Sequence, residues 1–252
     1  MKYHNENYNW KVTDSAACTP AVVFISGLGD GGDSWNGVHE NISRFTSALV
    51  YDRPGTGRRP VMTEPRSCQN LVLELHELLT LLDVQPPYIL VGHSFGGLVA
   101  RLFVCCYPAA VAGLVLVDAV AEYKELTFTR VLPPQHAAAC RESLLNPLLN
   151  SEHIDKLLSY KQVSAAKAAM PGDIPLSVIT RGLPDEADAD WPAQAILEIE
   201  QQSQAEFLEM SAVSRQVIAA GSGHYIQRAE PGIVIEEIMR ILASRQSNLT
   251  AK

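Results

Sequence analysis

The chain has 252 residues, of which 47% are hydrophobic and 19% charged, and its formal net charge is −8. This length suits one large domain or at most two, and the composition is that of a globular protein rather than of a disordered, collagen-like or coiled-coil chain. The acidic balance and the lack of a Lys/Arg cluster argue against nucleic acid or an anionic membrane as a partner.

The N-terminal segment and the cysteines bear on the cellular compartment. Residues 1–11 lack the apolar region of a secretory signal, and no run of 18 apolar residues predicts a membrane span. The five cysteines are odd in number and lack the spacing of a disulfide framework, and no Cys/His set has zinc-ligand spacing. We therefore expect a cytoplasmic protein with reduced thiols and no bound metal.

Short apolar runs alternate with helical patterns along the whole chain. The runs that we expect to form strands are residues 21–26, 48–52, 88–91, 113–117, 176–180 and 215–220. Leucines at helical spacing predict a helix over residues 67–82, and Pro231 marks the start of the last helix. The alternation predicts an α/β fold, in which helices cover both faces of a mostly parallel sheet.

One long interval, between residues 118 and 176, lacks an expected strand. Helical patterns over residues 134–145 and 152–170 fill it, and neither a repeat nor a Gly/Ser linker divides the chain. We therefore expect a single domain over residues 1–252, with a helical cap inserted at residues 120–175.

The strongest local signal is a G-x-S-x-G segment at residues 92–96, between an apolar run and a helical pattern. A nucleophile elbow needs this context, because its serine lies on a strained turn and only glycine neighbours let the strand and helix approach closely. Ser94 is therefore the candidate nucleophile. The alternative is a glycine-rich turn that contains a serine by chance.

A serine hydroxyl needs a base, and position selects His224 among the seven histidines. His224 lies in a glycine-containing loop between the last expected strand and the last helix, and this loop opens at the same carboxyl edge of the sheet as Ser94. His76 falls within an expected helix. We interpret His93, beside the nucleophile, as a packing or hydrogen-bonding neighbour.

Two aspartates could orient the histidine and fix its tautomer. Asp118 ends the apolar run 113–117, whereas Asp185 follows the run 176–180 within an acidic loop. An orienting carboxylate should be ordered and partly buried, which favours Asp118, with Asp185 as the alternative. Asp118 could also be a helix N-cap after its strand.

Acyl transfer also needs donors for the developing oxyanion. The glycine-rich loop 26–32 follows the first expected strand and can present backbone N–H groups. The expected pair of donors is the N–H of Leu28 and the N–H of Phe95.

Taken together, these segments resemble the α/β-hydrolase family. The resemblance also covers a D-x-x-G-x-G turn at residues 52–57 and the order serine, acid, histidine. It implies hydrolysis of an ester-like bond in a small molecule through an acyl-enzyme on Ser94, with His224 as general base and no cofactor. Most members carry the acid at the position of Asp185 and some at that of Asp118, and Ser26 stands where many members have histidine.

Two other interpretations compete with a hydrolase. Residues 27–32 read G-x-G-x-x-G, and Asp52 follows at the spacing of a dinucleotide-binding fingerprint. Asp30 and Asp33 argue against it, because they would place negative charge beside a pyrophosphate. The other is a ligand-binding member of the family that keeps the triad but turns over slowly or not at all.

Overall fold

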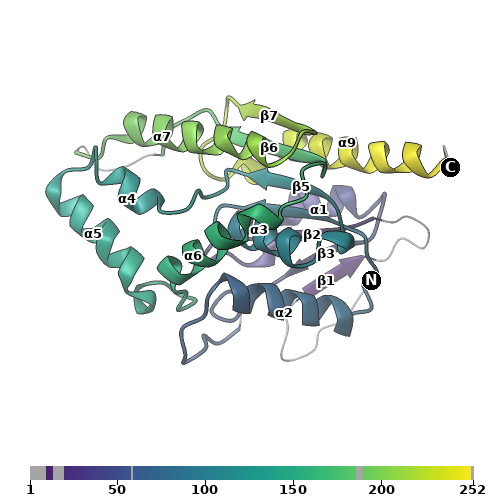
Figure 1. Ribbon diagram of the computed structural model, residues 1–252, viewed down its shortest axis with the longest axis horizontal. Helices are drawn as coiled ribbons and strands as arrows, with labels where there is room; N and C mark the ends of the chain where they lie inside the picture. Colours follow the sequence, from purple (N-terminus) through teal and green to yellow (C-terminus); the bar gives the residue numbers. More distant parts are fainter. Residues whose placement is uncertain (1–9, 14–19, 58, 186–189, 251–252) are drawn as a thin grey trace.

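The computed structural model describes residues 10–13, 20–57, 59–185 and 190–250, and a seven-stranded sheet runs through its middle (Figure 1). The spatial order of the strands is β1-β3-β2-β4-β5-β6-β7. The strands are β1 (Trp10–Thr13), β2 (Ala21–Ile25), β3 (Ala48–Tyr51), β4 (Tyr88–His93), β5 (Val111–Val117), β6 (Leu176–Arg181) and β7 (Ser214–Ala219). Among the strands of the described residues, β1 pairs antiparallel with β3 and the remaining pairs are parallel, so the expected mostly parallel sheet is confirmed.

The central strands are apolar because helices cover both of their faces. Every residue of β2, β4 and β5 is buried. In β2, Val22 and Phe24 belong to the core on one face, and Val23 and Ile25 to the core on the other. This two-sided burial explains why the strands read as continuous apolar runs rather than as alternating ones.

The helices form two layers (Figure 1). The α-helices outside the β5–β6 interval are α1 (Asn36–Ile42), α2 (Cys68–Leu81), α3 (Gly96–Cys106), α7 (Ala193–Ala205), α8 (Ile226–Ala229) and α9 (Pro231–Thr250). The short 3-10 helices there are η1 (Gly32–Trp35), η2 (Pro108–Ala110) and η5 (Glu206–Met210). Helices α1 and α9 pack together over one core, while α2 and α3 supply much of the other.

The β5–β6 interval is helical, as expected. It contains α4 (Lys124–Phe128), α5 (Pro134–Leu145), η3 (Pro147–Leu149), α6 (Lys156–Ala166) and η4 (Lys167–Ala169). Helices α4 and α5 lie beyond the end of the sheet, and α6 packs against α2 and α3 (Figure 1). The α/β fold with an inserted helical cap is therefore confirmed, while the cap limits of 120–175 stay a prediction.

The start of one expected helix needs correction, and one strand was missed. The helix expected over 152–170 begins only at Lys156, because the Asp155 side chain caps it by accepting a hydrogen bond from Leu158 N at 2.8 Å. Strand β1 was not expected at all, and its four residues are too few for a periodic signal.

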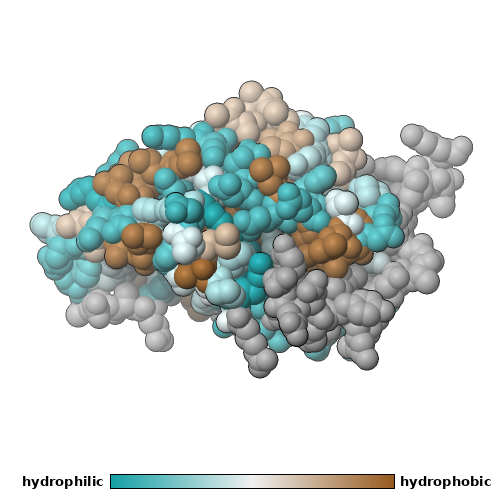
Figure 2. All heavy atoms as spheres, turned by 90° about the horizontal axis from the view of Figure 1, so that it is seen from below, coloured by the Kyte–Doolittle hydropathy of each residue, from teal (hydrophilic) through white to brown (hydrophobic). Residues whose placement is uncertain are grey.

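None of the helices in the described ranges combines the length and the apolar composition that a membrane span requires. Figure 2 shows one face of the molecule, on which hydrophobic residues form separate patches among hydrophilic ones.

Candidate active site

Ser94 lies on a strained turn between β4 and α3. Its φ is 51°, a left-handed conformation that costs energy for a residue with a side chain. The turn is held by hydrogen bonds from Ser94 N to Val117 O at 3.1 Å and from Gly97 N to Ser94 O at 3.0 Å. A Cβ on Gly96 would collide with the carbonyl oxygens that end β2, so only glycine lets α3 come this close to the sheet.

His224 and Asp118 meet at the carboxyl edge of the sheet. The distance from His224 Nδ1 to Asp118 Oδ2 is 2.6 Å, typical of a strong charge-assisted hydrogen bond. Asp118 follows β5 directly with a φ of 41°, and its N–H donates to Ile179 O at 2.8 Å. The Asp118 side chain is buried, whereas 27% of the His224 side chain is exposed. The buried Asp118 thus suits a carboxylate that orients the histidine, and the more exposed His224 suits a base that substrate can reach.

Two further groups surround the Asp118 carboxylate. Gln204 Nε2 donates to Oδ1 at 2.9 Å, and Arg181 Nε lies 3.8 Å from Oδ2. Burial alone would raise the pKa of Asp118, but the hydrogen bond and charge of His224, together with Arg181 and Gln204, hold it below its ordinary value. Asp118 is therefore ionised at neutral pH.

Asp185, the alternative acid, occupies a different environment. Its side chain is 49% exposed and pairs with Arg181 at 2.5 Å. Among the described residues, the ring nitrogen Nδ1 of His224 contacts Asp118 and not Asp185. The geometry favours Asp118 as the acid, and its catalytic role stays a prediction.

His93 forms a hydrogen bond to the backbone of the candidate base, His224. Its Nε2 lies 2.9 Å from the carbonyl oxygen of His224, so this nitrogen carries a proton and donates it. Burial, together with the charge of His224, lowers the pKa of His93 to about 3, so the ring is neutral. The interpretation of His93 as a hydrogen-bonding neighbour agrees with this contact.

The loop after β2 packs against the elbow. A Cβ placed on Gly27 would lie 3.0 Å from His93 Nδ1 and 3.2 Å from Ser94 Cβ. In the part of the chain that the structure describes, the N–H groups of Leu28 and Phe95 donate no hydrogen bond to another protein group. Both amides are thus free to receive an oxyanion, the role that we predict for them.

The structure does not support a dinucleotide site in the same loop. Asp52 is buried, and its Oδ1 accepts a hydrogen bond from Gly32 N at 2.7 Å. The carboxylate that would bind a ribose is thus engaged inside the protein. The α-helix that would receive the phosphates begins only at Asn36, beyond the glycines.

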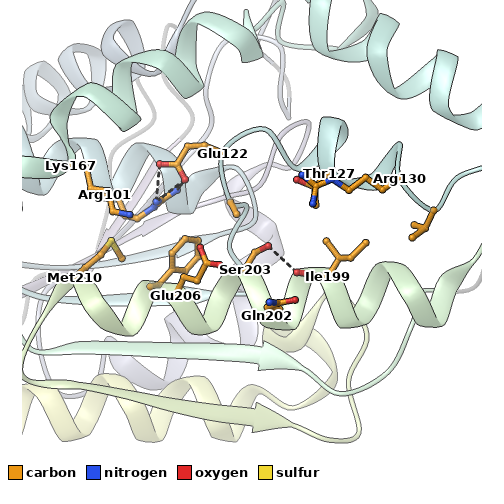
Figure 3. A pocket seen from close by; sticks show the side chains of 13 residues that line it. Arg101, Glu122, Thr127, Arg130, Lys167, Ile199, Gln202, Ser203, Glu206 and Met210 are labelled. Carbon is orange, nitrogen blue, oxygen red and sulfur yellow. Dashed lines mark hydrogen bonds and ion pairs between the residues drawn. The ribbon is translucent and has the colours of Figure 1, made fainter.

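A cavity of about 520 Å³ lies apart from these residues, between α3, α4 and the end of α7 (Figure 3). The buried Arg101 forms one wall and pairs with Glu122 at 3.1 Å. None of Ser94, Asp118 and His224 lines this cavity. Over the described residues, no cluster of three His, Cys, Asp or Glu side chains could hold a metal ion.

The alpha/beta hydrolase family profile matches residues 22–237, most of the chain. The chain therefore belongs to the alpha/beta hydrolase family. It is 28% identical over 217 residues to the uncharacterized protein YqjL of Bacillus subtilis, a match that covers 84% of this chain and 79% of YqjL.

The chain is also similar in sequence to part of a second protein, and similar in structure to a third. The chain is 37% identical over 100 residues to RutD of Cronobacter turicensis, a proposed carbamate hydrolase, but the match covers only 39% of this chain and 37% of RutD. The crystal structure of Lip1, a proposed lipase of Acinetobacter baumannii, superposes with a TM-score of 0.69 at 18% identity, covering 96% of this chain and 90% of Lip1. At that identity the superposition shows the fold.

Proposed function

We propose that this protein is a serine hydrolase that cleaves a carboxylic ester, lactone or related acyl bond in a small molecule. The observation that carries the proposal is the 2.6 Å contact between His224 and the buried Asp118, at the sheet edge where the strained Ser94 turn lies. A neutral histidine held in one tautomer by a carboxylate is the base that a serine nucleophile requires.

The reaction follows from these positions. Ser94 Oγ attacks the carbonyl carbon of the ester while His224 Nε2 takes the hydroxyl proton, and Asp118 stabilises the resulting imidazolium through Nδ1–H. The carbonyl oxygen becomes an oxyanion that accepts hydrogen bonds from the N–H groups of Leu28 and Phe95. The intermediate then collapses, the C–O bond breaks, and the alcohol leaves with the proton from His224.

The second half of the cycle regenerates the enzyme. Water gives a proton to His224 and attacks the acyl carbon on Ser94, and a second tetrahedral intermediate forms on the same donors. Its collapse releases the carboxylic acid and returns the proton to Ser94. The cycle uses only side chains and amides of this chain together with one water molecule.

We also propose a cytoplasmic location. The acidic composition supports it, as do the free thiols of the four cysteines that the structure describes. The fifth, Cys18, lies outside the described residues.

The test is hydrolysis of p-nitrophenyl acetate, p-nitrophenyl butyrate, a γ-lactone and an aryl carbamate by the wild type and by Ser94→Ala. We expect the wild type to turn over at least one of these compounds, with an initial burst of p-nitrophenol from the two p-nitrophenyl esters where deacylation is the slower step, and neither turnover nor burst in the variant. Equal rates for both proteins would overturn the proposal. A folded wild type that binds these compounds without cleaving them would favour the non-catalytic member of the family.

A further inference from the structure

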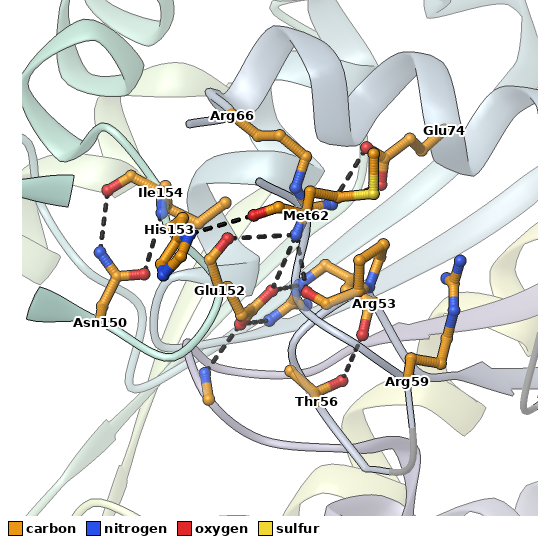
Figure 4. Close-up of polar contacts among 12 residues, drawn as sticks. Arg53, Thr56, Arg59, Met62, Arg66, Glu74, Asn150, Glu152, His153 and Ile154 are labelled. Carbon is orange, nitrogen blue, oxygen red and sulfur yellow. Dashed lines mark hydrogen bonds and ion pairs between the residues drawn. The ribbon is translucent and has the colours of Figure 1, made fainter. Parts of the chain in front are cut away.

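An arginine and a glutamate, 99 positions apart, form a buried ion pair (Figure 4), and both contact the backbone of the loop that carries Leu28. Arg53 follows β3, and Glu152 lies in the turn before α6. Arg53 Nε contacts Glu152 Oε2 at 2.7 Å and its terminal nitrogen NH2 contacts Oε1 at 2.8 Å. The two side chains are 2% and 0% exposed, so this pair is isolated from solvent.

Arg53 also binds the backbone of the loop. Its NH1 donates to Ser26 O at 2.8 Å, and its NH2 donates to Gly27 O at 2.6 Å. The Gly27 carbonyl and the Leu28 N–H belong to one planar trans peptide group, in which they point in opposite directions. The contact from Arg53 to Gly27 O therefore fixes the direction in which the Leu28 N–H points.

Glu152 holds the next peptide group. Its Oε1 accepts a hydrogen bond from Gly29 N at 2.8 Å. Gly27 and Gly29 flank Leu28, and Gly29 has a φ of 84°, so the loop runs through flexible positions. The ion pair restrains the backbone conformation that these glycines leave flexible, because it forms hydrogen bonds to the peptide groups on both sides of Leu28.

The charges suit this arrangement. Burial acts to lower the pKa of Arg53, but the charge and hydrogen bonds of Glu152 outweigh it and raise the pKa, so the guanidinium stays charged. A charged donor on Gly27 O polarises the shared peptide group and strengthens the Leu28 N–H as a donor. Glu152 neutralises the guanidinium, which would otherwise be costly to bury.

The segment that carries Glu152 is itself fastened to the core. Arg66 N donates to His153 O at 2.9 Å, and Asp155 N donates to Arg66 O at 2.7 Å. The Arg66 guanidinium also donates to Pro54 O at 2.7 Å and lies 3.9 Å from the Glu152 carboxylate. The position of Glu152 is thus fixed from both sides (Figure 4).

We propose that Arg53 and Glu152 are positioning residues that aim the Leu28 N–H at the oxyanion formed on a substrate at Ser94. The proposal rests on the proposed serine hydrolase function. Since Glu152 lies between α5 and α6, it also ties the inserted helical segment to the oxyanion site. A displaced segment would release Gly29 N and weaken the oxyanion site.

A purely structural ion pair would have a different effect from a positioning pair. An ester and its thionoester, in which sulfur replaces the carbonyl oxygen, react at the same Ser94. Sulfur accepts hydrogen bonds poorly, so the thionoester gains little from the Leu28 N–H. Loss of positioning lowers the rate on the ester selectively, whereas partial unfolding lowers both rates by the same factor.

The test compares p-nitrophenyl acetate with its thiono analogue in Arg53→Lys and Glu152→Gln. Arg101→Lys is the matched control, because Arg101 is an equally buried arginine paired with a glutamate, Glu122, outside the loop. For both test variants we expect kcat on the ester to fall about 10- to 100-fold, somewhat less than the loss of a whole oxyanion donor. KM and the thionoester rate should stay within about threefold, and the control should keep the wild-type ratio of rates.

The outcomes separate this inference from the function on which it rests. An unchanged ester-to-thionoester ratio in folded Glu152→Gln would overturn the positioning role, even if Arg53→Lys failed to fold. The same would follow if Arg101→Lys changed the ratio equally. A wild type that hydrolyses neither compound, nor the butyrate, the lactone or the carbamate, would instead overturn the proposed hydrolase function.

Discussion

The Asp118→Asn substitution tests the identity of the orienting acid. In the wild type, Asp118 Oδ1 accepts a hydrogen bond from Gln204 and Oδ2 accepts one from His224 Nδ1. The asparagine would keep its oxygen toward the Gln204 amide, because only an acceptor suits that donor. Its NH2 group would then face His224 Nδ1 and force the ring proton onto Nε2, the nitrogen that must accept the Ser94 proton.

The expected loss follows from this change of tautomer. Where an asparagine replaces a triad aspartate in this way, kcat falls by about 10⁴, which corresponds to about 5 kcal/mol of transition-state stabilisation. KM should change little, because Asp118 is buried and its two carboxylate oxygens are occupied by Gln204 and His224. The fold should persist, because Arg181 keeps Glu200 and Asp185 as partners.

Asp185→Asn is the matched control. Asp185 is half-exposed and pairs only with Arg181 among the described residues, so we expect its kcat to stay within about threefold of the wild type. The assay is steady-state hydrolysis of p-nitrophenyl acetate, with circular dichroism to confirm folding. Equal, mild losses in the two variants, or a larger loss in Asp185→Asn, would refute the assignment.

Two further predictions concern buried groups outside the acid. The pKa of His93 is about 3 in the folded protein, against 6.5 for a free histidine. Between these two pH values the unfolded chain therefore binds a proton that the folded protein does not bind. The free energy of unfolding should fall as the pH falls through this range, by about 1.4 kcal/mol per pH unit. Urea unfolding at pH 7, 6 and 5 should show a steeper decline for the wild type than for His93→Gln, and parallel declines would contradict this. Burial raises the pKa of the Cys68 thiol to about 12. Iodoacetamide at pH 8 should therefore modify the exposed Cys106 and leave Cys68 unmodified, which peptide mass spectrometry would measure. Equal modification of the two cysteines would refute the burial of Cys68.

Much of the fold was predictable because buried segments have a recognisable pattern of residues in the sequence. Strands covered on both faces read as continuous apolar runs, and the glycines around Ser94 mark a turn where strand and helix nearly touch. Strand β1 was missed because four residues carry too little pattern. The helix expected from residue 152 starts later because Asp155 caps it, and Glu152, which precedes this cap, is fully buried against Arg53.

The sequence could predict that the candidate site residues lie at the carboxyl edge of the sheet, but not which side chains contact each other there. Asp118 and Asp185 both follow strands that end at this edge, so sequence position left the acid open. The difference between them comes from side-chain surroundings: Asp118 turns inward to His224, and Arg181 engages Asp185. Arg181 ends a strand at the same edge and could have been suspected, whereas Gln204 approaches from α7 without any local signal.

The central claim is that Ser94 is an activated nucleophile, and intact-mass analysis after exposure to a fluorophosphonate tests it without any choice of substrate. The wild type should gain the mass of one phosphonyl adduct, and Ser94→Ala and His224→Ala should gain none under the same conditions. An adduct that persists in Ser94→Ala, or its absence from a correctly folded wild type, would contradict the claim.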